Sequence, residues 1–248
     1  MVIIGHSNLD LQQNLNRLHE YCNLWGLEVN IAQNKVVVFR KRGPVRTDER
    51  WYYNNELLDV VNEFNYLGVV FNFTGSFVLN NQCIIGKGLK AMHVLLQHIK
   101  RLEVNPKLPL QLFDAFVGSI LNYGCPIWVF SKSKDIERLH LKFCKTLLGV
   151  CQSTSNAAVY GELGRVPLYI NRYVQVIKYW FKVISSENII VKSVYDNSIL
   201  TNVRGDSWPF KVKLLLESYG FSDVWLHPEQ FYVPTFISSF KQRVTDAF

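Results

Sequence analysis

The sequence predicts an α+β fold, in which a small mixed or antiparallel sheet with one helix is followed by a larger region that is entirely helical. Runs rich in β-branched and aromatic residues lie before Gly75, whereas apolar residues recur at helical spacing after it. Hydrophobic residues make up 48% of the 248 residues, which is enough for a sizeable core. We therefore expect a boundary near Gly75.

One helix is predicted in the first region, over residues 10–25. Asp10 is a suitable N-cap, and Gly26 suits the position after the last helical turn. The apolar face of this helix comprises Leu11, Leu15, Leu18, Cys22 and Trp25.

Short strands are predicted around this helix, with Asn54 and Asn55 as a turn between two of them. A single strand cannot bury its own faces, so the strand at 1–4 either pairs far along the chain or has lost its neighbour. The predicted strands are residues 1–4, 35–39, 51–53, 57–61 and 64–71.

After Gly75 the apolar pattern predicts a series of helices. The apolar segment 125–130 contains a proline and is expected to be a buried connector. The predicted helices are residues 80–103, 110–121, 133–148, 168–185, 210–219 and 229–244. The chain is therefore divided into residues 1–75, residues 76–195 and a C-terminal helical tail, 196–248, of unknown role.

The net charge and the number of cysteines limit the classes of protein to which this chain can belong. The formal net charge of +7 favours anionic partners, nucleic acid first and acidic membrane surfaces second. The five cysteines are odd in number and form no Cys-x-x-Cys pair, which is typical of free thiols in a reducing compartment. With no secretory signal and no apolar run of about 18 residues, we expect an intracellular protein without a membrane partner.

No motif in the sequence predicts a catalytic or a metal site. The six histidines form no His-x-His or His-Glu-x-x-His pattern. Lys87 lies between Gly86 and Gly88, but the rest of a phosphate-binding loop is absent. Gly118-Ser119 lacks the glycine spacing of a nucleophile elbow. We therefore assign no catalytic residue, no metal ligand and no cofactor to this chain.

Two basic sets are better candidates, as contacts to nucleic acid. The first follows a predicted strand and is interleaved with aromatic residues, which can stack on bases. The second lies on two predicted helices, where Lys134, Arg138, Lys142 and Lys145 share a face. A solvated loop and an ordinary exposed helix face are the alternatives. The cations chosen are Lys35, Arg40, Lys41, Arg42, Lys87, Lys90, Arg138 and Lys142.

Several stretches occur in an order and spacing that resemble a known family. They are Met1–Ser7, Trp25–Asn30, Lys35–Phe39, Phe64–Val69, Tyr123–Trp128, Ile136–His140 and Val159–Leu168. Together they resemble the C-terminal part of the reverse transcriptase of LINE-type (non-LTR) retrotransposons, close to the jockey-like elements. The resemblance implies the end of a palm in residues 1–75, followed by a helical thumb and connector in residues 76–195.

The resemblance also implies roles for individual residues. Tyr66, Leu67 and Gly68 match the family's Tyr-Leu-Gly signature at the primer grip, which holds a strand by its backbone. The family's catalytic aspartates, which use Mg²⁺ in the general two-metal scheme, would lie before Met1. The chain by itself is then not an enzyme, and its partners are an RNA/DNA template–primer, bound weakly, and the missing fingers and palm of the polymerase, in the nucleus or cytoplasm.

One position departs from the family pattern. The family usually has Asn-x-x-Lys-Thr before the strand that begins at Lys35, and this chain has Gln33 where the family lysine would stand. Glutamine cannot act as a general acid near neutral pH. The alternatives to a polymerase fragment are a domesticated helical module that binds protein and an unrelated small enzyme.

Overall fold

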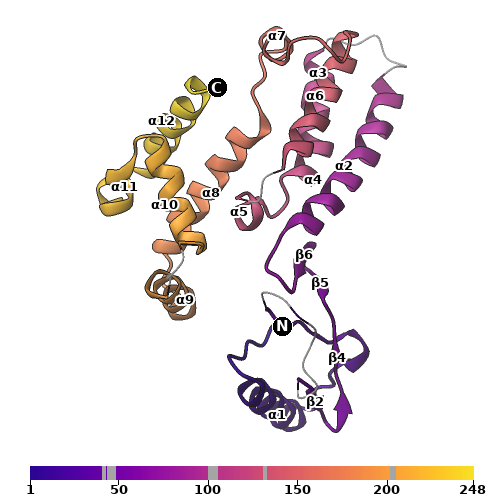
Figure 1. Ribbon diagram of the computed structural model, residues 1–248, viewed down its shortest axis with the longest axis vertical. Helices are drawn as coiled ribbons and strands as arrows, with labels where there is room; N and C mark the ends of the chain where they lie inside the picture. Colours follow the sequence, from indigo (N-terminus) through magenta and orange to yellow (C-terminus); the bar gives the residue numbers. More distant parts are fainter. Residues whose placement is uncertain (41–42, 44–48, 100–105, 131–132, 202–204) are drawn as a thin grey trace. The chain divides into compact units, whose positions relative to one another are not determined.

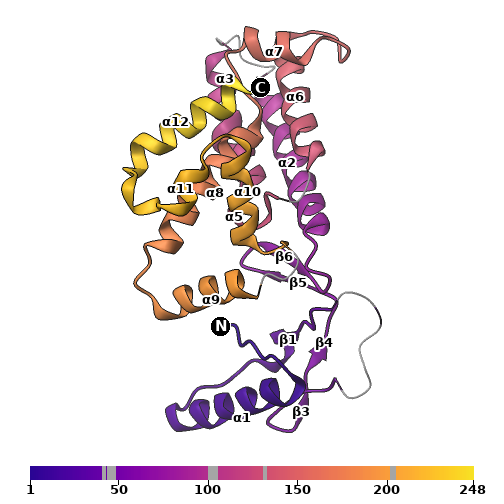
Figure 2. The same ribbon diagram turned by 60° about the vertical axis from the view of Figure 1, so that its left-hand side comes forward.

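The computed structural model describes residues 1–40, 43, 49–99, 106–130, 133–201 and 205–248 (Figures 1 and 2). The chain forms two compact units, Met1–Asn80 and Asn81–Phe248. The first contains one long helix and short strands, and the second is built from helices. The predicted α+β class is confirmed.

Helix α1, Asn8–Trp25, is the main element of the first unit. Its N-cap is Ser7, whose hydroxyl accepts a hydrogen bond from the Asp10 N–H at 3.1 Å, so the prediction of Asp10 as the cap was wrong. Gly26 ends the helix with a φ of 61°, as predicted. Trp25 does not join the buried face, because its ring lies beside Tyr21 and is 65% exposed.

The strands of the first unit form three two-stranded sheets within the described residues. Strand β1 (Lys35–Val36) pairs in parallel with β4 (Asp59–Val60). The other two sheets are antiparallel hairpins, β2 (Tyr52–Tyr53) with β3 (Glu56–Leu57) and β5 (Glu63–Tyr66) with β6 (Val69–Asn72). Residues 1–4 form no strand, because none of the described segments supplies the ladder that a strand needs.

Two further strand predictions are corrected. The segment 57–61 is divided between β3 and β4, and 64–71 folds back on itself as the β5–β6 hairpin. Leu67 and Gly68 both have positive φ, 48° and 83°, which reverses the chain between the strands. The apolar pattern does not distinguish one strand from two that are joined by a two-residue turn. The Asn54–Asn55 turn is confirmed, with φ of 47° and 65°.

The core of the first unit is small and lies between α1 and the short strands. Its buried residues are Leu15, Val36, Trp51, Tyr53 and Leu58. The indole N–H of Trp51 donates to the Asn8 carbonyl at 3.1 Å, which ties the β2 region to the start of α1.

The helices that follow are α2 to α12. Helix α2 begins in the first unit, and α3 and α4 are joined by a π-helical segment, η2, into one rod. The bounds are α2 Val78–Ile99, α3 Lys107–Leu112, η2 Phe113–Gly118, α4 Ser119–Leu121, α5 Cys125–Trp128, α6 Lys134–Leu148, α7 Asn156–Glu162, α8 Leu168–Ile184, α9 Ile189–Leu200, α10 Trp208–Ser218, α11 Ser222–Leu226, the 3₁₀ turn η3 Pro228–Gln230 and α12 Val233–Asp246.

The long amphipathic helices of the second unit were predicted to within a few residues at the ends that the structure describes. The predicted connector 125–130 instead contains α5, and α7, α9 and α11 were missed. Three of these four are short, and α9 carries apolar residues on several sides, so none has a clear helical stripe.

Helix α8 lies at the centre of the second unit and packs against α5, α6 and α12 (Figure 1). The core around it is rich in aromatic rings. Trp180 stacks on Trp225 with ring centroids 5.4 Å apart, and its indole N–H donates to the Tyr195 hydroxyl at 2.9 Å. Among the described helices, none is long and apolar enough to cross a membrane.

Candidate nucleic-acid interface

The β5–β6 hairpin carries the Tyr66-Leu67-Gly68 sequence at its tip. Tyr66 is the last residue of β5, and Leu67 and Gly68 form the turn. Leu67 is 73% exposed and adopts the left-handed conformation, which costs a residue with a Cβ about 1–2 kcal/mol. Asparagine and glycine would fill this position at lower cost. The tip of the hairpin thus presents an exposed apolar side chain on a strained backbone.

Arg40 braces the base of this hairpin. Its backbone N–H donates to the Phe73 carbonyl at 2.9 Å, and its guanidinium lies 4.6 Å from the Phe73 ring centre. The guanidinium also donates to the side-chain oxygen of Asn62 at 3.0 Å and to the carbonyls of Gly43 and Val38. Much of its donor capacity is thus used within the unit, and its first role is to position the hairpin.

Lys35 is also engaged within the first unit. Its ammonium lies 2.7 Å from the carboxylate of Asp59, the residue opposite it in the parallel pair of β1 and β4. Such a partly exposed ion pair contributes at most about 1 kcal/mol. The two other cations predicted near this strand, Lys41 and Arg42, lie outside the described residues.

The cations predicted in the second unit lie on α2 and α6. Lys87, Lys90, Arg138 and Lys142 are all exposed. Arg138 forms an ion pair with Asp135 at 2.6 Å on the same helix. The predicted fourth member of the α6 face, Lys145, is instead buried, and its ammonium donates to the Gln152 carbonyl at 2.7 Å beyond the helix end. The basic face on α6 is therefore shorter than predicted, because it does not include Lys145.

Gly88 has a packing role between these two cationic helices. A Cβ at this position would lie 2.6 Å from a methyl group of Leu121 and 3.5 Å from Leu139, so any larger residue requires the Leu121 side chain to shift. Figures 1 and 2 show these helices side by side. The Gly86-Lys87-Gly88 sequence thus has a structural explanation in its second glycine.

Two ion pairs in the second unit were not anticipated. Arg165 donates to both carboxylate oxygens of Asp114, at 2.7 and 2.5 Å. Buried Arg172 pairs with Glu137, whose other oxygen accepts the Leu168 N–H at 2.9 Å and so caps α8. Each pair joins residues far apart in the sequence, so no local spacing could have indicated it. The first pair joins η2 to the segment that precedes α8, and the second joins α6 to α8.

His140 lies among these charges and is fully buried. Its ring stacks on Phe113 at 5.3 Å and tilts against Tyr160 at 5.6 Å. Burial, followed by the positive charge of Arg165, lowers the pKa of His140 to about 3. The imidazole is therefore neutral at physiological pH. In the part of the chain that the structure describes, no cluster of three or more His, Cys, Asp or Glu residues could hold a metal ion.

Comparison with known proteins gives one informative match. An uncharacterised transposon-derived protein of Caenorhabditis elegans is 26% identical over 155 residues. The matched stretch covers 60% of this chain and 54% of that protein, so the match spans about half of the relative's length. No protein family and no solved structure matches the chain. The likeness supports a transposon origin for the chain.

Proposed function

We propose that the chain is part of the reverse transcriptase of a non-LTR retrotransposon and that it holds the RNA/DNA template–primer. The observation that carries the proposal is the exposed, strained Leu67 at the tip of the β5–β6 hairpin. The transposon-derived relative supports a transposon origin, and the ordered sequence motifs resemble those of the reverse transcriptase.

The hairpin has the properties that a backbone grip needs. A glycine in the turn has no side chain, so a phosphate can approach the main chain closely. Leu67 presents an apolar side chain beside it, which can contact a sugar or a base edge. Arg40 and Phe73 support the base of the hairpin, so its tip is held by contacts that a ligand does not have to form.

The chain would position the template–primer and perform no chemistry. The carboxylates that would hold two Mg²⁺ ions belong, in this proposal, to another part of the polymerase. The exposed cations on α2 and α6 would contact phosphates without reading sequence. Gln33 stands where a general acid would be needed, which is consistent with a role that does not include proton transfer.

Binding of the chain to a labelled RNA–DNA hybrid across a salt series tests the proposal, with a Mg²⁺-dependent primer-extension assay alongside. We expect binding that weakens steeply between about 50 and 200 mM salt, because phosphate contacts release counterions. We expect no extension. Absence of binding at the lowest salt would exclude the template–primer role, and extension would show that the chain contains its own catalytic site.

The Leu67→Asn substitution distinguishes the effect of the hairpin tip on hybrid binding from its effect on stability. Asparagine tolerates the left-handed conformation, so the variant should raise the free energy of unfolding by roughly 1 kcal/mol. It also removes the apolar tip, so hybrid binding should weaken. Leu24→Asn is the matched control, since Leu24 is equally exposed on α1 at 79%. Equal binding by both variants and the unchanged chain would remove the hairpin tip from the interface.

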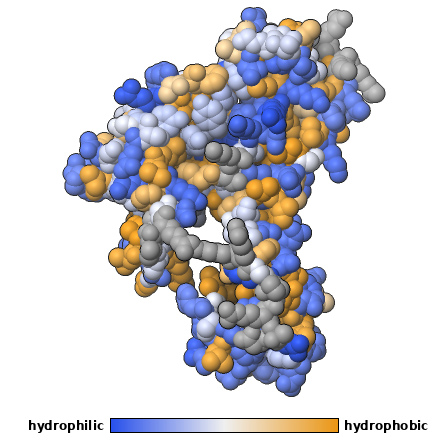
Figure 3. Space-filling model, in the orientation of Figure 1, coloured by the Kyte–Doolittle hydropathy of each residue, from blue (hydrophilic) through white to orange (hydrophobic). Residues whose placement is uncertain are grey.

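A protein-binding module remains the second candidate, and α9 favours it. None of its residues is buried, and Ile189, Ile190, Val194 and Leu200 are each more than 60% exposed. Figure 3 shows apolar surface where α9 lies in Figure 1. Exposed apolar patches are typical of interaction surfaces. Failure of the chain to bind any nucleic acid at low salt would favour this candidate.

A further inference from the structure

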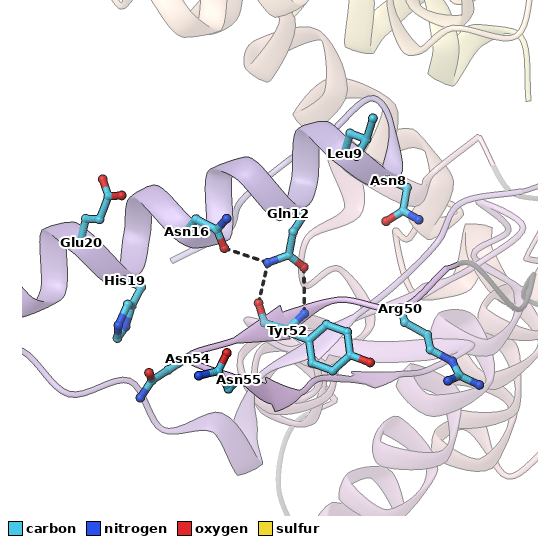
Figure 4. Close-up of a pocket in the computed structure, with 10 residues that line it drawn as sticks. All are labelled: Asn8, Leu9, Gln12, Asn16, His19, Glu20, Arg50, Tyr52, Asn54 and Asn55. Carbon is cyan, nitrogen blue, oxygen red and sulfur yellow. Dashed lines mark hydrogen bonds between the residues drawn. The ribbon is translucent and has the colours of Figure 1, made fainter.

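A polar groove lies between α1 and the β2–β3 hairpin in the first unit (Figure 4). Its volume is about 690 Å³. The α1 wall presents Asn8, Gln12, Asn16 and His19, which recur every three or four residues on one side of the helix. The Asn16 side-chain oxygen accepts a hydrogen bond from the Gln12 amide at 2.9 Å, and the carboxylate of Glu20 also lines the groove.

The side chain of Gln12, on α1, holds the opposite wall of the groove, which is strand β2. Its side-chain nitrogen donates to the Tyr52 carbonyl at 2.8 Å, and its side-chain oxygen accepts from the Tyr52 N–H at 2.9 Å. Figure 4 shows that this amide bonds the backbone edge of β2 as a neighbouring strand would. The edge is therefore closed to an added peptide strand at Tyr52, and the backbone that carries the Tyr52 ring is held in place.

Tyr52 and Arg50 are the ligand-facing groups of this wall. The Tyr52 side chain is exposed, with the residue 43% accessible, and within the described residues its ring contacts no other ring. Arg50 is exposed and forms no ion pair with any described residue. The two lie two residues apart, and Figure 4 shows both side chains at the same end of the groove. An exposed aromatic ring beside a guanidinium that has no ion-pair partner among the described residues suits a base and its phosphate.

We infer that this groove binds single-stranded RNA, with a base stacked on Tyr52 and a phosphate at Arg50. The inference rests on the proposed function and deepens it, since it assigns a site for the unpaired template outside the duplex. Unpaired RNA is the form that fits, because only unstacked bases can lie flat on an aromatic side chain.

The test measures binding of the full chain to a labelled single-stranded RNA of about 12 nucleotides and, separately, to an RNA–DNA hybrid. Tyr52→Ala should weaken binding of single-stranded RNA about tenfold, since it removes one stacking platform. Tyr52→Phe keeps the ring and should recover most of that loss. Arg50→Gln, an exposed change, should reduce the salt slope by about one unit.

Tyr21→Ala is the control, because Tyr21 is an exposed aromatic residue of α1 outside the groove. Circular dichroism checks that each variant is folded. Equal RNA affinity for Tyr52→Ala, Arg50→Gln and the control overturns the inference, and retained hybrid binding would then leave the proposed function standing. Tyr52-dependent RNA binding without hybrid binding would support the groove and remove the template–primer role. Tyr52-dependent binding of an acidic peptide in place of RNA would also overturn the inference.

Discussion

The two units of the molecule are stabilised in different ways. The first has a small core and depends on polar braces, in which the side chains of Gln12, Arg40 and Trp51 bond to backbone or amide groups of distant segments. The second has an aromatic core around α8 and is also held by the Arg165–Asp114 and Arg172–Glu137 ion pairs.

This difference bears on function. A unit of about 80 residues buries a smaller fraction of its surface than a larger one, so more of its polar and aromatic side chains stay accessible. Both the Leu67 tip and the Tyr52 groove lie in the first unit. The second unit also has exposed aromatic residues, but its exposed cations on α2 and α6 are ordinary solvated helix faces by comparison.

The largest effect is expected from tryptophan truncation in each core. Trp180→Ala removes a fully buried ring of the second unit and should lower the free energy of unfolding by about 3–5 kcal/mol. Trp51→Ala should instead open residues 1–80 locally and leave the second unit protected. Hydrogen exchange of the two variants measures this. Loss of protection throughout the chain in Trp51→Ala would show that the two units do not unfold separately.

Acid should weaken the second unit through His140. Its folded pKa of about 3 lies below the usual value of about 6.5, so the unfolded state takes up the proton first as pH falls. The contribution of neutral His140 to the free energy of unfolding is complete above about pH 6.5. It is lost progressively towards pH 3, at up to about 1.4 kcal/mol per pH unit.

His140→Phe removes this titration and keeps a ring against Phe113. Chemical unfolding should therefore show that the free energy of unfolding falls less in the variant than in the unchanged chain between about pH 6.5 and about pH 4.5. The expected difference is roughly 2–3 kcal/mol. An identical acid dependence in both proteins would mean that His140 reaches water in the folded state.

The smallest effects come from two glycines of α2 that differ only in what surrounds them. Gly88→Ala places a Cβ 2.6 Å from Leu121 and should destabilise the chain by about 1–3 kcal/mol. Gly86→Ala meets nothing within 4 Å and should stabilise it by about 0.5–1 kcal/mol. Thermal unfolding of the pair measures both. Stabilisation by both substitutions would show that Leu121 moves aside at little cost.

Local sequence patterns predicted part of the fold. The amphipathic helices α1, α6 and α8 follow from apolar residues at helical spacing, and the glycines after α1 and α6 end them in the left-handed conformation. Residues 64–71 look like one strand in the sequence, because apolar and aromatic residues continue through the two-residue turn. Helix α9 has no apolar stripe that a period could detect, so the sequence did not predict it.

The candidate site shows the same division. The sequence indicated Tyr66-Leu67-Gly68 and the basic residues near it, but it placed the turn inside a strand and assigned Arg40 to a ligand only. It did not single out the groove, although Gln12 and Asn16 have the one-face spacing that could have signalled it. The sequence does not show which residue each of these side chains contacts.

By itself, the sequence determined the α+β class, the long helices and the basic character of the chain, because each depends on composition or on residues a few positions apart. Only the tertiary structure decided which charges are engaged and which are open. Lys35 and Asp59 are 24 residues apart, and Arg165 and Asp114 are 51 apart. A pairing at that separation depends on the path of the whole backbone, and no local period contains it.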